Sequence, residues 1–184
     1  MLGRQLLSSL SYQVANVGDP RDALLLSRTA VTGAPEATPV VRALLLERVA
    51  WAAARAADAD AARRALYSVD DAYDRREDPG AEPEWVYWLD RNEIDVMAGR
   101  CLIELGRPAR AEPLLTNAVS QYPSEHARES ALYLSWLVEA HARAGDLDAA
   151  RDAAERAQAF AASTPSARVD ARLRTLRSLL PELG

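Results

Sequence analysis

The stretch DVMAGRCLIELGRPARAEPLLTNAVSQYP, residues 95–123, decides the fold. It contains two helical patterns joined by a tight turn at Gly106. The first pattern carries the small pair at 98–99, and the second carries Ala111 and Ala118, seven residues apart. Helices whose axes lie about 8–10 Å apart need small side chains where they cross. The stretch therefore predicts a hairpin of two closely packed helices.

The same pattern occurs three more times along the chain. Turn positions 18, 57, 106 and 145 are separated by 39, 49 and 39 residues. RAADADAAR at 55–63 matches RAGDLDAAR at 143–151 in seven of nine positions, with Ala57 where the other turns have glycine. Two further alanine pairs, at 23 and 30 and at 150 and 157, repeat the spacing of seven. The longest interval contains RREDPGAEPE, residues 75–84, which the prolines and glycine predict to be a loop.

The small pair, the turn glycine, the paired alanines and the closing Pro123 resemble the tetratricopeptide repeat (TPR). This resemblance implies an all-α fold, a TPR-type α-solenoid of four helix-turn-helix repeats plus a C-terminal capping helix. The chain is expected to be a single TPR domain over 1–184, with repeats at about 4–34, 38–74, 86–123 and 124–163, the loop at 75–84 and the capping helix at 165–180. The last helix of a solenoid needs a polar outer face, which shields the open end of the array from solvent.

Composition excludes several classes of function. The 184 residues carry 22 basic and 27 acidic side chains, every basic one an arginine, for a net charge of −5. An acidic balance argues against direct nucleic-acid binding by this segment. No run approaches the ~20 apolar residues that span a bilayer. The single cysteine, Cys101, excludes an intrachain disulfide and fits a reducing cytoplasm, so we expect a cytoplasmic protein without membrane contact.

No sequence motif points to catalysis or to a metal. His126, His141 and Cys101 lack the paired spacing of zinc ligands. Phosphate-binding glycine loops and nucleophile motifs are absent from the sequence. We therefore expect no enzymatic activity and no cofactor, and we interpret Cys101 as a buried, inert thiol.

In TPR arrays the first helix of each repeat lines an inner groove, which binds peptides. The resemblance places ten side chains of this chain on that groove: Tyr12, Asn16, Glu47, Trp51, Arg55, Arg100, Glu104, Ser135, Glu139 and Arg143. Stacked aromatics beside an arginine suit an extended peptide or an amphipathic ligand. The alternative is that Trp51 packs under the next helix, and the sequence does not decide between the two.

Four longer strings resemble a narrower group. They are LLSSLSYQVANVGDPRDAL (6–24), RALLLERVAWA (42–52), WVYWLDRNEIDVMAGRCLIELGRP (85–108) and RESALYLSWLVEAHARAGD (128–146). They are similar to the C-terminal TPR region of actinobacterial XRE (Cro/CI-like) helix-turn-helix transcriptional regulators. In that family an N-terminal helix-turn-helix binds DNA and the TPR region senses a ligand or a partner. The 184 residues of this chain contain no such DNA-binding motif.

The resemblance implies a regulatory domain that binds a protein, a peptide or a small molecule. The alternative is a stand-alone TPR scaffold that assembles other proteins. A further expectation concerns the first helix, which carries Leu2, Leu6, Leu7 and Leu10. Because preceding repeats would cover these leucines in a longer parent chain, we expect self-association here as a two-fold dimer. The competing interpretation is that the first turns fray and the patch is smaller.

Overall fold

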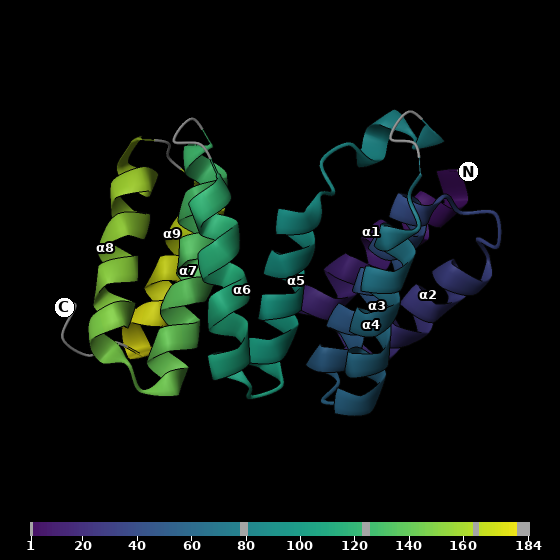
Figure 1. Ribbon diagram of the computed structural model, residues 1–184. Coiled ribbons are helices and arrows are strands. Elements are labelled where there is room, and N and C mark those ends of the chain that lie inside the picture. The colour runs from purple at the N-terminus through teal and green to yellow at the C-terminus, as the bar shows by residue number, and fades with distance from the viewer. Residues whose placement is uncertain (1, 78–80, 123–125, 164–165, 180–184) are drawn as a thin grey trace. The chain divides into compact units, whose positions relative to one another are not determined.

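A computed structural model describes residues 2–77, 81–122, 126–163 and 166–179. These residues form nine α-helices, two short 3-10 helices and no strand (Figure 1). The all-α prediction is therefore confirmed for the described chain. The chain divides into two compact units, Met1–Leu105 and Gly106–Gly184, each built from neighbouring helices packed on one another. The predicted closing Pro123, the loop residues 78–80 and the start and end of the predicted capping helix lie outside the described residues.

The first unit is arranged around α3. It contains α1 (Leu2–Val17), α2 (Pro20–Thr32), α3 (Pro39–Arg55), α4 (Ala59–Asp74), the 3-10 helix η2 (Glu84–Val86) and α5 (Arg91–Glu104). Helix α3 packs against α4 most extensively, and also against α1, α2 and α5. Most of its residues are buried, because it is apolar on nearly every side. Because four helices pack on α3, it contacts every other α-helix of the first unit.

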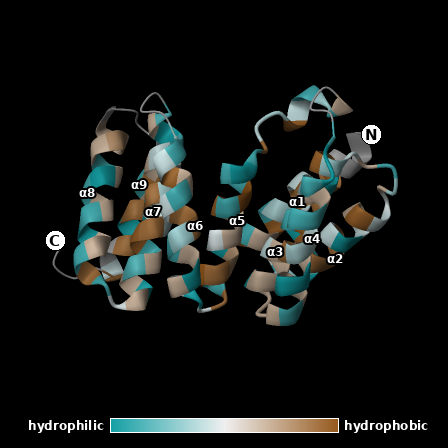
Figure 2. Ribbon diagram, in the orientation of Figure 1, coloured by the Kyte–Doolittle hydropathy of each residue, from teal (hydrophilic) through white to brown (hydrophobic). Residues whose placement is uncertain are grey.

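The second unit is arranged around α7. It contains α6 (Pro108–Gln121), α7 (Ala127–Ala144), α8 (Leu147–Ser163), α9 (Ala167–Leu176) and the 3-10 helix η3 (Arg177–Leu179). Helix α7 packs against α6, α8 and α9. Along the helices, hydrophobic and hydrophilic bands alternate (Figure 2), as amphipathic helices with one buried face require. Helix α9 ends at Leu176, so the predicted last helix is shorter than expected and continues as a 3-10 turn.

The alanines predicted to stand at helix crossings are buried. Ala111 and Ala118 are fully inaccessible to solvent. The members of the other two pairs are at most 1% exposed: Ala23 and Ala30, and Ala150 and Ala157. Burying a methyl group at each crossing lets two helices approach closely without leaving a void. In the second predicted repeat, Ala62 and Val69 occupy the equivalent spacing and are equally buried.

The repeated nonapeptide forms the same local structure twice. After α3, Ala57 has φ +58°, and the Asp58 N–H donates to the Ala53 carbonyl at 2.9 Å. After α7, Gly145 has φ +86°, and the Asp146 N–H donates to the His141 carbonyl at 3.0 Å. This six-to-one hydrogen bond closes a helix C-terminus around a left-handed residue. Each aspartate then caps the next helix, accepting from the Ala61 or the Ala149 N–H at 3.0 Å.

Gly18 is the exception among the four predicted turns. Gly106 has φ +69°, in the same left-handed region as Ala57 and Gly145, whereas Gly18 is not among the residues with positive φ. A Cβ added at Gly18 would lie 3.2 Å from the Val14 carbonyl oxygen, so close packing constrains this position instead. The first turn is therefore built differently from the other three, although the sequence places a glycine in it.

Candidate functional site

Seven of the ten predicted groove residues lie together in the first unit. We call them the groove cluster: Tyr12, Asn16, Glu47, Trp51, Arg55, Arg100 and Glu104. They come from the facing sides of α1, α3 and α5, three helices that pack on one another because α3 contacts both of the others. The register taken from the repeat pattern thus brings these side chains to one place. Their role as ligand contacts stays a prediction.

Arg100 is the centre of the groove cluster. Its guanidinium is buried, donates a hydrogen bond of 3.0 Å to the Tyr12 hydroxyl, and lies 4.5 Å from the centroid of the Trp51 ring. A guanidinium over an indole face is attracted by the ring's quadrupole. Trp51 is only 7% exposed, and its Nε1 donates to Oδ1 of Asn16 at 3.2 Å. In this structure Trp51 packs beneath α5, the alternative that the sequence had left open.

Arg55 connects the ends of the same helices. Its Nη1 forms an ion pair with Oε1 of Glu104 at 2.6 Å, and its Nε donates to the Ala15 carbonyl at 3.2 Å. Both charged side chains remain partly exposed, so solvent screens the pair and its contribution to stability is modest. The contact fixes the end of α3 against α1 and α5.

Glu47 is the anomalous member of the cluster. It is 3% exposed, and neither carboxylate oxygen has a hydrogen-bond partner among the described residues. The pKa of Glu47 is raised to about 8, mainly by burial; Arg48 and Arg100 act to lower it and Glu93 acts to raise it. An unpaired buried carboxyl is therefore protonated at neutral pH. It borders a void of only about 10 Å³, at the lower limit for a single water molecule and too small for a ligand.

Cys101 borders the same void and is buried as predicted. Desolvation raises the pKa of its thiol to about 12. A thiol with so high a pKa forms almost no thiolate at neutral pH, and the thiolate is the reactive form. The interpretation of Cys101 as an inert packing residue agrees with this geometry.

The other three predicted groove residues lie in the second unit, on α7. Ser135 is buried and its hydroxyl donates to the Leu132 carbonyl at 2.5 Å. Glu139 is also buried and pairs with Arg143 at 2.6 Å and with Arg172 from α9. Burial and pairing hold the polar atoms of Ser135 and Glu139 inside the unit, while Arg143 is exposed. Their role in binding stays a prediction.

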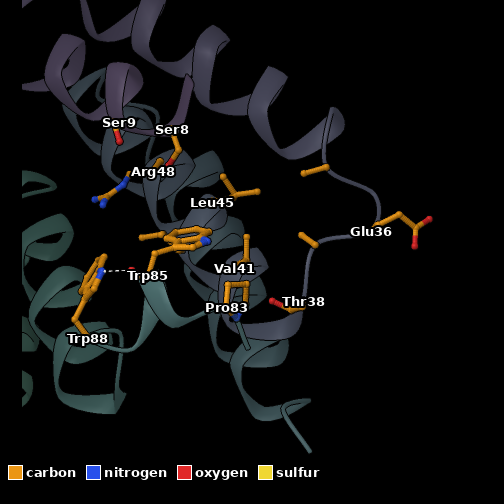
Figure 3. Close-up of a pocket in the computed structure, with 13 residues that line it drawn as sticks. Ser8, Ser9, Glu36, Thr38, Val41, Leu45, Arg48, Pro83, Trp85 and Trp88 are labelled. Carbon is orange, nitrogen blue, oxygen red and sulfur yellow. Dashed lines mark hydrogen bonds between the residues drawn. The ribbon is translucent and has the colours of Figure 1, made fainter. Parts of the chain in front are cut away.

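A second cavity, of about 250 Å³, lies between α1, α3 and the residues around η2 (Figure 3). We call it the tryptophan pocket. Its walls come from α1, from the segment before α3, from α3 and from the residues around η2: Ser8, Ser9, Ala34, Glu36, Ala37, Thr38, Val41, Leu44, Leu45, Arg48, Pro83, Trp85 and Trp88. The volume is just under the ~300–1,000 Å³ typical of small-molecule sites, and the lining has the usual apolar walls with few polar groups.

Glu82 holds the aromatic wall of the pocket in place. Its Oε1 accepts a hydrogen bond of 3.0 Å from the Val40 N–H, and its other oxygen accepts one from the Thr38 hydroxyl. Thr38 is the N-cap residue of α3 but does not cap the helix with its own side chain. A carboxylate at a helix N-terminus satisfies an otherwise unpaired N–H and interacts favourably with the helix dipole. The tether places Pro83 and Trp85 over the first turns of α3.

The aromatic residues themselves are ordered by local contacts. The Trp88 Nε1 donates to the Trp85 carbonyl at 3.1 Å. Figure 3 shows the Trp85 indole at the middle of the pocket, with Val41 and Leu45 on one side and Trp88 and Arg48 on the other. Trp85 is half-buried and Trp88 is 36% exposed. Two indoles held at an open cavity present large apolar faces to anything that enters it.

The groove register did not include Trp85, Trp88 or Arg48 among the candidate site residues. A signal for the aromatics was present, since three of the chain's eleven aromatic residues lie within 85–88, directly after the proline-containing loop. Arg48 follows Glu47 on α3; it contacts the Tyr12 ring of the groove cluster and also lines the pocket on the side of Trp85. No spacing rule on a single helix shows which loop will cover that side.

Within the described parts of the chain, no helix is both long and apolar enough to cross a membrane, and no three His, Cys, Asp or Glu side chains are grouped to hold a metal ion. Comparisons of the chain with protein-family models, with curated proteins and with solved structures give no match.

Proposed function

We propose that this chain is the ligand-binding regulatory TPR domain of a bacterial helix-turn-helix transcriptional regulator, acting in the cytoplasm without catalysing a reaction. The finer fold is part of the proposal: four TPR repeats and a C-terminal capping helix. Packed consecutive pairs α1–α2, α3–α4 and α7–α8, with alanines at their crossings, support it. The repeated turn structure after α3 and α7 supports it as well.

The observation that carries the binding role is the tryptophan pocket. It is a cavity of about 250 Å³ with two indoles, aliphatic side chains and few polar groups. Cavities of this lining are the usual sites of small-molecule binding. Leaving two tryptophans at an open surface costs hydrophobic free energy that a bound apolar group would recover.

The pocket is also placed where a ligand could change the conformation of the unit. Its walls belong to α1, to α3 and to the segment around η2, which Glu82 tethers to α3. A ligand that contacts all three stabilises the arrangement in which they are close together. Such a shift in population is how a sensing domain transmits binding to a domain attached to it.

The second candidate function is a stand-alone scaffold that binds other proteins. The exposed apolar side chains of α1 favour it: Leu6 is 67% exposed, Leu10 49% and Val17 86%. Exposed apolar residues gathered on one helix are a feature of protein-binding surfaces. Under this alternative the partner is a protein, and the tryptophan pocket has no ligand.

A thermal-shift screen against apolar small molecules tests the primary proposal. The key variant is Ser9→Trp, since Ser9 is exposed on α1 and lines the pocket, so an indole there fills the opening. The matched control is Ser68→Trp on the exposed face of α4. Compounds that raise the melting temperature of the wild type and of the control, and fail with Ser9→Trp, support the proposal. A screen without hits, or hits unaffected by Ser9→Trp, contradicts it.

A second arm concerns DNA. With a net charge of −5, the chain is expected to show no sequence-selective binding to duplex DNA at physiological salt, because such binding depends on neutralising phosphates with basic groups. Gel-shift titration with genomic fragments measures this. Selective binding by this chain alone would contradict the assignment of DNA recognition to another domain.

A further inference from the structure

We infer that the tryptophan pocket binds a compact amphipathic carboxylate, whose anionic group pairs with Arg48 and whose apolar body lies against Trp85. The inference rests on the proposed function, and it adds the chemical class of the ligand. The choice of a carboxylate follows from Arg48, which lies in the pocket wall, and from the charged groups around it.

Arg48 is a cation in the wall of the pocket without an acceptor among the described residues. Its Nε is buried and has no hydrogen-bond partner there, and no carboxylate of the described chain lies within ion-pair distance of the guanidinium. The contact observed is with the face of Tyr12, 4.4 Å from the ring centroid. Burial lowers the pKa of Arg48, because desolvation disfavours the charged form. A desolvated guanidinium is an efficient binder of a planar anion, since it offers paired N–H donors.

The surrounding charges leave this site positive. Arg48 has Glu47, Glu93 and Arg100 as its charged neighbours. The pKa of Glu47 is about 8, so this carboxyl is largely neutral at pH 7 and does not compensate the arginines. Glu36 lines the pocket but is exposed to solvent, which screens its charge. An anion that enters the pocket therefore meets the guanidinium of Arg48, while Glu36, the carboxylate in the lining, lies at an exposed position.

The shape of the pocket limits the ligand. Its volume of about 250 Å³ suits a metabolite-sized molecule and not an extended peptide. Figure 3 shows the Arg48 guanidinium at one end and the Trp85 indole beside it, so charge and apolar surface are adjacent and not mixed. One arginine in the wall matches one negative charge, which favours a carboxylate over a phosphate dianion. The walls formed by Val41 and Leu45 accept an aromatic or aliphatic body.

Isothermal titration calorimetry with matched probes tests the inference on the whole chain. The probes share one body and differ in one group: 4-phenylbutyrate, 4-phenylbutanamide and 4-phenylbutylamine, with octanoate and octanamide as a second pair. We expect each carboxylate to bind at least about tenfold more tightly than its amide, the discrimination expected of a charge-assisted pair. The amine is expected to bind most weakly, because it is repelled by Arg48.

Two substitutions at Arg48 assign the effect. Arg48→Gln should remove the preference for carboxylate while amide binding persists. Arg48→Lys keeps the positive charge and should keep part of the preference; it serves as the test if Arg48→Gln folds poorly. Arg64→Gln, which removes an exposed arginine of α4, is the matched control and should change nothing. Equal affinity for carboxylate and amide in the wild type overturns the inference but not the proposed function. Absence of binding by all probes also overturns it, and the screen with Ser9→Trp then decides the proposed function separately.

Discussion

Arg100 and Tyr12 are joined by a hydrogen bond of 3.0 Å although 88 residues separate them in the sequence. Arg100 belongs to α5 and Tyr12 to α1, and α3 lies against both helices. The same guanidinium lies over the Trp51 ring of α3. One buried arginine thus links three helices, in a place where a mismatched polar group would be costly. The groove cluster is consequently part of what stabilises the first unit, whatever else it binds.

Removing the Tyr12 hydroxyl should weaken the first unit. Tyr12→Phe keeps the ring under Arg48 and Arg100 but deletes the acceptor of the Arg100 hydrogen bond. Hydrogen bonds to charged groups contribute about 1.5–3 kcal/mol, and part of this is recovered by solvent at a half-buried site, so we expect a loss of about 1–2 kcal/mol. Urea unfolding followed by circular dichroism measures it. The control is Tyr67→Phe, which alters a 67% exposed tyrosine and should leave stability unchanged.

Glu47 should make the protein less stable as the pH rises. Its pKa is raised from 4.5 to about 8 by burial in the folded chain. The folded state therefore binds the proton more tightly than the unfolded state, so stability is fully present below about pH 4.5 and falls between about pH 5 and 8. One pKa unit corresponds to about 1.4 kcal/mol, so the total loss is on the order of several kcal/mol.

Glu47→Gln tests this directly, since the amide cannot ionise. The variant should unfold at similar urea concentrations at pH 5 and pH 8.5, and at pH 8.5 it should be more stable than the wild type. The matched control is Glu155→Gln, which changes an exposed carboxylate on α8 and should leave the pH dependence of the wild type in place. A wild type whose stability does not decline across this pH range would contradict the assignment of a neutral Glu47.

Ala57 is strained by its backbone and should be improved by glycine. It has φ +58°, the left-handed conformation, which costs an L-residue about 1–2 kcal/mol. Glycine removes that cost, but it raises the conformational entropy of the unfolded chain, which lowers the free energy of unfolding by about 0.4–1 kcal/mol. The net effect of Ala57→Gly should be a stabilisation of about 0.5–1 kcal/mol. The opposite change is available at the equivalent turn. Gly145→Ala meets no atom within 4 Å, so its destabilisation would report the backbone cost alone. Opposite shifts in melting temperature are expected.

Much of the fold followed from short-range rules in the sequence. The paired alanines predicted close helix packing because a crossing excludes larger side chains, and Ala111 and Ala118 are buried on α6, which packs on α7. The repeated nonapeptide predicted a shared turn, since Asp58 and Asp146 cap the next helix in the same way. The exact start of α5 did not follow. It begins at Arg91 because Asp90 caps it by accepting from the Glu93 N–H, after a 3-10 turn that no helical period indicates.

The pocket could not be predicted because it depends on contacts between distant segments. Arg48 lies next to Glu47 on α3, but the two residues border different cavities. Which loop covers Arg48 is decided by Glu82, whose partner Val40 is 42 residues away. Helical periodicity identifies faces of one helix and not the segments that will cover them. The groove register placed Tyr12, Trp51 and Arg100 on helices that lie next to one another, and the structure brings these three side chains together. Their role in binding stays a prediction.

Cutting the tether of Glu82 should loosen the aromatic wall. Glu82→Gln keeps the size of the side chain but removes the charge that interacts with the N-terminus of α3. We expect a loss of about 0.5–2 kcal/mol, the range for helix caps, together with faster acrylamide quenching of tryptophan fluorescence. Glu84→Gln, an exposed neighbour in η2, is the control. Unchanged quenching in Glu82→Gln would show that the wall is held by other contacts.

The first helix should mediate self-association through two leucines. Leu6 is 67% exposed and Leu10 49%, whereas Leu7 packs against the core at Ala30, Ala34 and Leu45; the side chain of Leu2 lies outside the described residues. Burying these leucines against a second copy would remove apolar surface from water at about 25 cal/mol per Å².

Sedimentation velocity over a range of concentrations should show a dimer that Leu6→Glu with Leu10→Glu converts to monomer. The matched double variant, Leu25→Glu with Leu147→Glu, adds the same charge at other exposed leucines and should still dimerise. Two results would contradict the prediction: a wild type that stays monomeric at high concentration, or a dimer that both double variants disrupt equally. The second would assign dissociation to added charge and not to the apolar face of α1.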